Sequence, residues 1–134
     1  MNSFQFQTVP NIISGLGSIQ QLRGILTARP YQHLLLVTDV GMLQHQLHFP
    51  ILEILEDLLL TYSIYSEVEA DPSEQIVLNA VDYAKQQKVD LVLGFGGGSS
   101  MDVAKIIAIL SHPAQQQQLA DLYGVNNAQT PRLP

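Results

Sequence analysis

A stretch of glycines is the part of this sequence best suited to chemistry. Residues 94–98 read Gly-Phe-Gly-Gly-Gly, follow an apolar run at residues 91–93 and precede Ser99. An apolar run of this kind is typical of a strand buried on both faces, and glycines allow the sharp turn that follows it. The first N–H groups of a helix after such a turn have no partners and attract anions. The pattern therefore predicts a phosphate or pyrophosphate site.

Ser99 and Asp102 have the spacing of a capping box, which predicts that Ser99 caps the helix after the glycines. The alternative to a phosphate site is a tight turn without a ligand. Four glycines in five residues argue against it, because a plain turn does not need that loss of backbone entropy. The stretch matches neither common phosphate motif. Ser99 stands where Gly-x-Gly-x-x-Gly requires its third glycine, and no Gly-Lys-Ser or Gly-Lys-Thr follows.

Residues 96–105, Gly-Gly-Gly-Ser-Ser-Met-Asp-Val-Ala-Lys, resemble the Gly-Gly-Gly-Ser-x-x-Asp-x-Ala-Lys signature of the iron-containing alcohol dehydrogenases. This family is related to glycerol dehydrogenases and dehydroquinate synthases. Residues 10–18 resemble the opening segment of the same family, and residues 37–41 resemble its Val-Thr-Asp-x-Gly motif. The resemblance covers nearly the whole chain, but enzymes of this family are more than twice as long.

The resemblance implies an NAD site built from Asp39, Asp71, Gly96, Gly97, Gly98, Ser99, Ser100 and Asp102. It implies that Asp39, at the end of a buried strand, accepts hydrogen bonds from the adenosine ribose. A carboxylate there also repels a 2′-phosphate, which favours NAD over NADP. The alternative is that Asp39 caps a short helix after Gly41.

Asp71 allows two interpretations. Asp71-Pro72-Ser73-Glu74 has the pattern of a helix start, with an aspartate cap, a proline at the first helical position and a glutamate at the third. The family commonly has asparagine at the position of Asp71, near the cofactor. Aspartate accepts a hydrogen bond but does not donate one, so both the cofactor role and the cap stay open.

The remaining pattern alternates strands and helices. We expect strands at residues 4–8, 33–38, 62–68 and 91–93, and helices at residues 18–27, from Pro50, at 71–87 and after Ser99. This order predicts an α/β fold with a Rossmann-like parallel sheet flanked by helices, forming one domain over residues 1–134. The last of these helices is apolar nearly all round, which predicts that it also packs against something beyond this domain.

Composition excludes several functions. Twelve acidic and six basic residues give a net charge of −6, which argues against nucleic-acid and anionic-membrane partners. The absence of cysteine excludes disulfides and thiolate chemistry. The N-terminus has no secretory signal pattern and no apolar run is long enough to span a bilayer, so we expect a cytoplasmic protein. His45 and His48 are expected to be a solvated pair.

The resemblance implies a further, all-helical domain in the family, which supplies one aspartate and three histidines to a divalent metal, iron or zinc. No residues of this chain match those ligands. We therefore expect the NAD-binding half of a metal-dependent alcohol dehydrogenase, inactive as an isolated chain and assembled as a homodimer through the strand at residues 4–8. The alternatives are a free-standing nucleotide-binding module, a vestigial assembly module, and half of an enzyme similar to dehydroquinate synthase or glycerol dehydrogenase.

Overall fold

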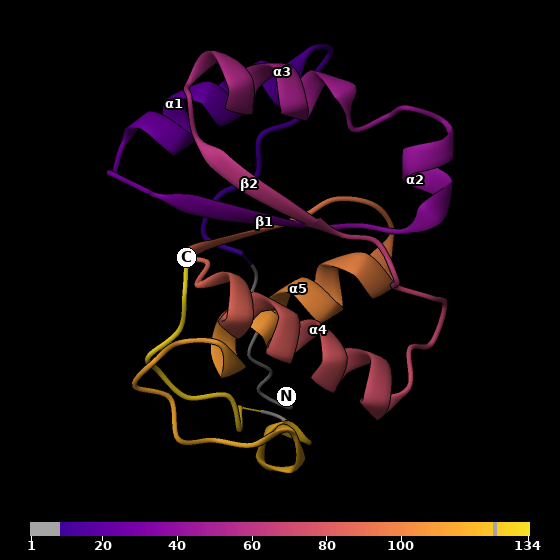
Figure 1. The fold of residues 1–134 in the computed structure, drawn as a ribbon, viewed down its shortest axis with the longest axis vertical. Coiled ribbons are helices and arrows are strands. Elements are labelled where there is room, and N and C mark those ends of the chain that lie inside the picture. The colour runs from indigo at the N-terminus through magenta and orange to yellow at the C-terminus, as the bar shows by residue number, and fades with distance from the viewer. Residues whose placement is uncertain (1–8, 125) are drawn as a thin grey trace, which may run out of the picture.

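The computed structural model describes residues 9–124 and 126–134, and shows a parallel sheet covered by helices on both faces (Figure 1). Its strands are β1 (His33–Val37), β2 (Thr61–Tyr65) and β3 (Leu91–Gly94), in the order β2-β1-β3. The α/β fold class predicted from the sequence is confirmed. The strand expected at residues 4–8 lies outside the described residues. The helices are η1 (Ser18–Gln21), α1 (Leu22–Thr27), α2 (Val40–Gln44), α3 (Phe49–Asp57), α4 (Glu74–Gln87), α5 (Gly98–Leu110) and η2 (Leu119–Leu122).

Strand β1 is the centre of the fold because it pairs with both other strands. Leu34 pairs with Tyr62 of β2 and with Leu91 of β3. Side chains alternate between the faces of a strand, so successive residues of β1 enter different cores. Leu34 and Leu36 pack with α1 and α3, whereas the residues between and after them pack with α4 and α5. A continuous apolar run is what a strand covered on both faces requires.

The helix expected to begin at Pro50 is α3, with the proline in its first turn. Ile51, Ile54 and Leu55 are buried against the sheet, as expected. The apolar pattern of this segment also places Leu59 on the buried face of the helix, and that prediction is wrong. The helix ends at Asp57, and Leu59 has a left-handed backbone and is 92% exposed.

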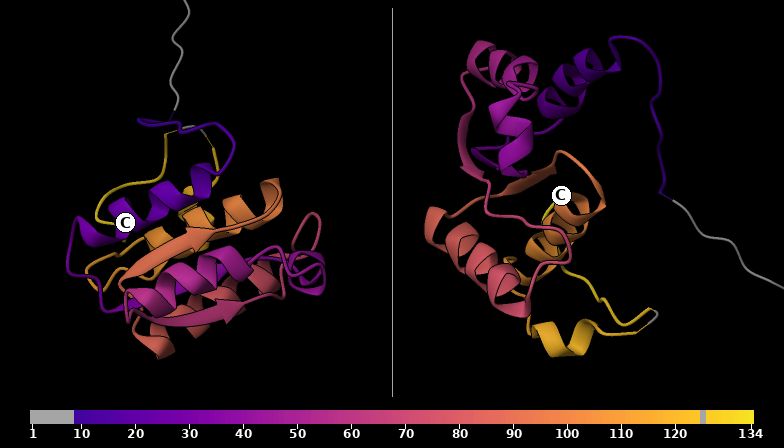
Figure 2. Two further views of the ribbon diagram at one scale, coloured as in Figure 1. Left: turned by 90° about the horizontal axis from the view of Figure 1, so that it is seen from above. Right: turned by 90° about the vertical axis from the view of Figure 1, so that its right-hand side faces the viewer.

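Helices α4 and α5 cover the other face of the sheet, as Figure 2 shows from two further directions. Gly94 lets α5 lie close to β3, since a Cβ on Gly94 would be 2.9 Å from the Cβ of Ala104. The hydroxyl of Tyr65 donates to the carbonyl of Ile76 at 3.3 Å, which ties the end of β2 to α4. Burial raises the pKa of this hydroxyl, and the charge of Glu67 adds to the effect.

Two helix starts differ from the sequence prediction. Helix α4 is capped by Ser73, whose hydroxyl accepts from the N–H of Ile76 at 3.3 Å. Asp71 lies two residues earlier with a left-handed φ of 49°, so the prediction that it caps the helix is wrong. The helix expected at residues 18–27 begins as the 3₁₀ turn η1 after Gly17, whose left-handed conformation starts it without a side-chain cap.

The histidine prediction is half wrong. His45 is exposed, but His48 is 7% exposed and stacks edge-on against Phe49. The Nδ1 atom of His48 is buried and has no hydrogen-bond partner among the described residues. The two rings therefore do not form a solvated pair.

The segment after α5 is held to the domain by polar side chains. Gln115 donates to the carbonyls of Gln129 and Pro131, at 2.9 Å in both cases. These contacts bring the end of the chain back to the sheet, where the N–H of Val92 donates to the carbonyl of Pro134 at 3.0 Å. Gln115, the first of four successive glutamines, therefore has a structural role.

Candidate dinucleotide site

The carboxyl ends of β1 and β3 bring the aspartate and the glycine turn together. Both strands run in the same direction and pair directly, so the residues that follow them emerge at the same edge of the sheet. A Cβ on Gly96 would lie 3.0 Å from Oδ2 of Asp39 and 3.1 Å from Oγ of Ser100. Ligands of open α/β sheets bind at this edge. The structure thus brings together three of the predicted site residues: Asp39, and Gly96 and Ser100, which follow it by 57 and 61 positions in the sequence.

Asp39 performs the capping role that the sequence left open. Its Oδ1 accepts from the N–H of Met42 at 3.0 Å, which makes it the N-cap of α2. The helix begins at Val40, before Gly41 rather than after it. The other carboxylate oxygen, Oδ2, points toward Gly96 and accepts no hydrogen bond from the described residues. Capping therefore uses one oxygen and leaves the second available to a ligand.

The glycines of the turn are of two kinds. Gly94 and Gly96 are required by the protein itself, because each has another atom where a side chain would be and Gly96 has a φ of 139°. Apart from their chain neighbours and the backbone of α5, no atom of the described residues lies within 4 Å of a Cβ added to Gly97 or Gly98, and both are exposed. Gly97 has a φ of −77°, which any residue adopts. Nothing in the described protein requires glycine at these two positions.

The N-terminus of α5 is open. The first hydrogen bond of the helix is donated by Met101 to the carbonyl of Gly97, at 3.2 Å. The N–H groups of the three residues before Met101 therefore have no partner within the helix. Gly97 is the N-cap, without a side-chain hydrogen bond, so the prediction that Ser99 caps this helix is wrong. Asp102 does not complete a capping box but pairs with Lys105 at 3.1 Å, on the surface.

The other predicted residues line a neighbouring hollow. Asp71, Ser99 and Asp102 surround a space of about 250 Å³ with Glu74 and Tyr123. The hydroxyl of Tyr123 donates to the carboxylate of Glu74. This hydrogen bond raises the pKa of the Tyr123 hydroxyl, with smaller contributions from burial and from the charge of Glu74. Three carboxylates disfavour a diphosphate here, so the backbone amides of α5 are the better anion site.

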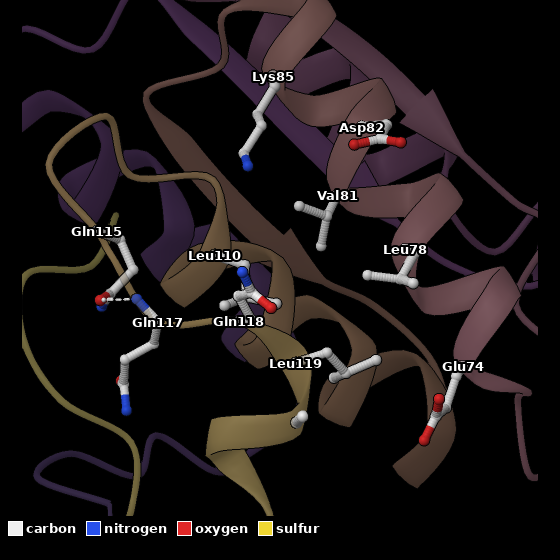
Figure 3. Close-up of a pocket in the computed structure, with 11 residues that line it drawn as sticks. Glu74, Leu78, Val81, Asp82, Lys85, Leu110, Gln115, Gln117, Gln118 and Leu119 are labelled. Atoms are coloured by element: carbon white, nitrogen blue, oxygen red, sulfur yellow. Dashed lines mark hydrogen bonds between the residues drawn. The ribbon is translucent and has the colours of Figure 1, made fainter.

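A second cavity lies next to this hollow and shares Glu74 with it. It has a volume of about 370 Å³ and separates α4 from the segment at residues 115–120 (Figure 3). Its wall carries Lys85 but also two acidic residues, Glu74 and Asp82. None of the residues predicted from the sequence to bind a cofactor lines it. Its mixed charges point to no particular ligand.

Two contributors to the site were not assigned from the sequence. Gly41 lies against Asp39, since a Cβ on Gly41 would be 3.1 Å from Oδ1 of the carboxylate. Its place two residues after the aspartate is a local signal for such a contact. Tyr123 lies 49 residues after Glu74 in the sequence and offered no signal, because only the folding of the last segment brings the two together.

Metal ligands are not grouped in the described part of the chain. Residues 9–124 and 126–134 contain no cluster of three His, Cys, Asp or Glu side chains that could hold a metal ion. The residues present therefore do not fit the divalent metal of the resembled family. No described helix is both long and apolar enough to cross a membrane.

The parallel strand order and the helices on both faces of the sheet define the class: a parallel α/β domain. The sequence model of the iron-containing alcohol dehydrogenases matches residues 10–134. This chain belongs to that family.

Relatives with assigned functions are similar over almost all of this chain. A sulfoacetaldehyde reductase from Bilophila wadsworthia is 28% identical over 132 residues, which are 98% of this chain and 34% of the relative. An NAD-dependent methanol dehydrogenase from Bacillus methanolicus is 28% identical over 125 residues, 93% of this chain and 32% of the relative. The chain thus spans about a third of the length of these relatives.

Solved structures show the same fold. The NADH-dependent butanol dehydrogenase A from Thermotoga maritima has a TM-score of 0.73 and 28% identity, over 83% of this chain and 28% of the other. A 1,3-propanediol oxidoreductase has a TM-score of 0.79 over 88% of this chain and 30% of the other. At 23% identity, the second comparison supports the fold alone.

Proposed function

We propose that this chain is the NAD-binding part of an NAD-dependent, metal-dependent alcohol dehydrogenase. The diphosphate of the cofactor binds to the open N–H groups at the start of α5, beside Gly97 and Gly98. The adenosine ribose binds to Oδ2 of Asp39. Two similar proteins, a methanol dehydrogenase and a butanol dehydrogenase, are named for their use of NAD or NADH.

The observation that carries this proposal is the empty space around Gly97 and Gly98. Glycine loses more backbone entropy on folding than any other residue. A position without close packing or a left-handed backbone has no structural need of glycine that offsets this cost. A ligand that approaches the backbone explains why both positions lack a side chain. The partial positive charge at the start of a helix makes that ligand an anion.

The chain's own residues bind and orient the cofactor. The amides of α5 neutralise the diphosphate, and Asp39, already held by Met42, accepts from the ribose hydroxyls without first having to be ordered. When bound, the nicotinamide accepts or donates the hydride. Because the described residues form no metal site, we derive no metal-assisted step from them. We expect the isolated chain to bind NAD without oxidising alcohols.

A cytoplasmic location and a homodimer stay predictions. The homodimer depends on the strand expected at residues 4–8, which lies outside the described residues. Asp71 and Asp102 are proposed to contact the cofactor from the hollow that they form with Glu74. Ser99 lines the same hollow, next to the proposed diphosphate site. The cationic ring of the oxidised nicotinamide is better suited to that hollow than a phosphate is.

The test is binding of NADH, followed by its fluorescence, to the wild-type chain and to Gly97→Val. We expect the variant to stay folded, because the Cβ of the new side chain would meet no described atom within 4 Å other than those of its chain neighbours, and Gly97 is exposed. We expect it to lose binding, because the side chain occupies the proposed place of the diphosphate. Gly24→Val is the matched control, since Gly24 is equally exposed and open but lies in α1 on the other face of the sheet. Unchanged binding in Gly97→Val would contradict the proposed site.

A further inference from the structure

The carboxylate of Asp39 lies between two glycines. A Cβ on Gly41 would be 3.1 Å from Oδ1, and a Cβ on Gly96 would be 3.0 Å from Oδ2. Ordinary van der Waals contacts of such an atom begin at about 3.4 Å. Each glycine therefore leaves room for one carboxylate oxygen, and a side chain at either position would displace the oxygen that it meets.

We propose that Gly41 and Gly96 are positioning residues that set the preference for NAD over NADP. This inference rests on the proposed function of Asp39 as the acceptor for the ribose. The two glycines and the N–H of Met42 hold the carboxylate in one orientation, with Oδ2 directed at the turn after β3. Selectivity thus depends on where the charge is held as well as on its presence.

Orientation matters because hydrogen bonds are short and directional. A carboxylate binds two neighbouring hydroxyl groups well only when both oxygens lie within about 2.5–3.0 Å of them. A displacement of a few tenths of an ångström weakens these hydrogen bonds. Turning the carboxylate away also reduces its repulsion of a 2′-phosphate. The NAD affinity then falls while the relative affinity for NADP rises.

Gly41 offers the cleaner test of the two. Its only neighbour within 4 Å of an added Cβ is the Asp39 carboxylate, and its backbone is not in the left-handed region. It lies inside α2, where alanine is a better helix former than glycine. Gly96 is less suitable, because a substitution there also strains a backbone with a φ of 139° and meets Oγ of Ser100.

The experiment measures the dissociation constants of NAD and NADP for the wild-type chain, Gly41→Ala and Gly24→Ala. Gly24 is also a helical glycine, but no atom lies within 4 Å of its added Cβ. For Gly41→Ala we expect the NAD affinity to fall about tenfold and the NADP-to-NAD preference to move toward NADP. Gly24→Ala should keep the NAD affinity and the NADP-to-NAD preference of the wild-type chain. A loss of folding would weaken the binding of NAD and NADP equally, and the ratio of their dissociation constants would stay unchanged.

Two results overturn the inference, and they are distinguishable from failure of the proposed function. If the wild-type chain binds NAD and Gly41→Ala has the same affinity and the same ratio, the glycine does not position the carboxylate. If Gly41→Ala loses both cofactors equally, its effect is structural and the inference is also wrong. If the wild-type chain binds neither cofactor, the proposed function itself fails.

Discussion

Helices α4 and α5 pack side by side on one face of the sheet but begin in opposite ways. Helix α4 is closed by the hydroxyl of Ser73 and carries an acidic residue, Glu74, in its first turn. Helix α5 begins at Gly97 with no side-chain cap and no acidic residue in its first turn. Both helices need acceptors for their first N–H groups. Helix α4 finds an acceptor in Ser73, whereas α5 has no side-chain cap among the described residues.

This difference teaches how to separate glycines that a fold needs from glycines that a ligand needs. Gly94 lies against Ala104 and Gly96 has a left-handed backbone, so both belong to the fold. Gly97 and Gly98 meet nothing within 4 Å. Four neighbouring glycines that look alike in the sequence thus form two groups: two that lie against other residues, and two that do not among the described residues and are proposed to serve a ligand.

The largest expected effect comes from giving α5 the cap that it lacks. In Gly97→Asp the carboxylate accepts from the free N–H groups, so the free energy of unfolding rises by about 0.5–1 kcal/mol. The same carboxylate repels the diphosphate, and NAD affinity should fall roughly 100-fold, or about 2.7 kcal/mol. Calorimetric titration and chemical denaturation measure the two changes. Gly24→Asp adds the same charge elsewhere and should leave binding intact; equal losses in both variants would break the comparison.

The next largest effect tests a glycine of the fold. In Gly94→Ala the new methyl group lies 2.9 Å from the Cβ of Ala104 and 3.3 Å from the Cα of Met101, so α5 has to move away from β3. Overpacking of this kind costs about 1–3 kcal/mol of unfolding free energy. Urea denaturation followed by circular dichroism measures it. A change below about 0.5 kcal/mol would show that Gly94 is not required for packing.

A smaller effect tests the closed helix. Ser73→Ala removes the side-chain acceptor for the N–H of Ile76 and should lower the unfolding free energy by about 1 kcal/mol. NADH binding should not change, because α4 offers no donors to the cofactor in the proposed arrangement. Asp71→Gly is the control for stability, since Asp71 lies outside the helix and glycine tolerates its left-handed backbone while lacking a side-chain acceptor. A larger loss of stability in Asp71→Gly than in Ser73→Ala would reverse the assignment of the cap.

The smallest effect is expected at Gly98, the first residue of α5. Alanine there meets no atom within 4 Å and restricts the unfolded chain, so Gly98→Ala should raise the unfolding free energy by about 0.5 kcal/mol. Thermal unfolding of the free protein measures this. A clear destabilisation would move Gly98 into the group of glycines that the fold requires.

The sequence predicts the elements well but their ends poorly. Strand β1 and the order of strands and helices follow from apolar runs and helical periodicity, which are local properties of the chain. The caps were assigned wrongly at Ser99 and at Asp71, because several neighbouring residues are able to cap a helix and the final choice depends on where packing begins it. The burial of His48 was also missed, because tertiary contacts decide the path of the chain before α3.

The amino-acid sequence by itself determined the α/β class, the strand–glycine–helix unit and the family, because each depends on residue types at fixed spacing. The tertiary structure alone decided which glycines face empty space and which face protein. It also decided that Asp39 lies against Gly96, 57 residues later. The physical reason is the order of the strands: β1 and β3 are neighbours although β2 separates them in the sequence. The proposed cofactor site exists only where their ends meet.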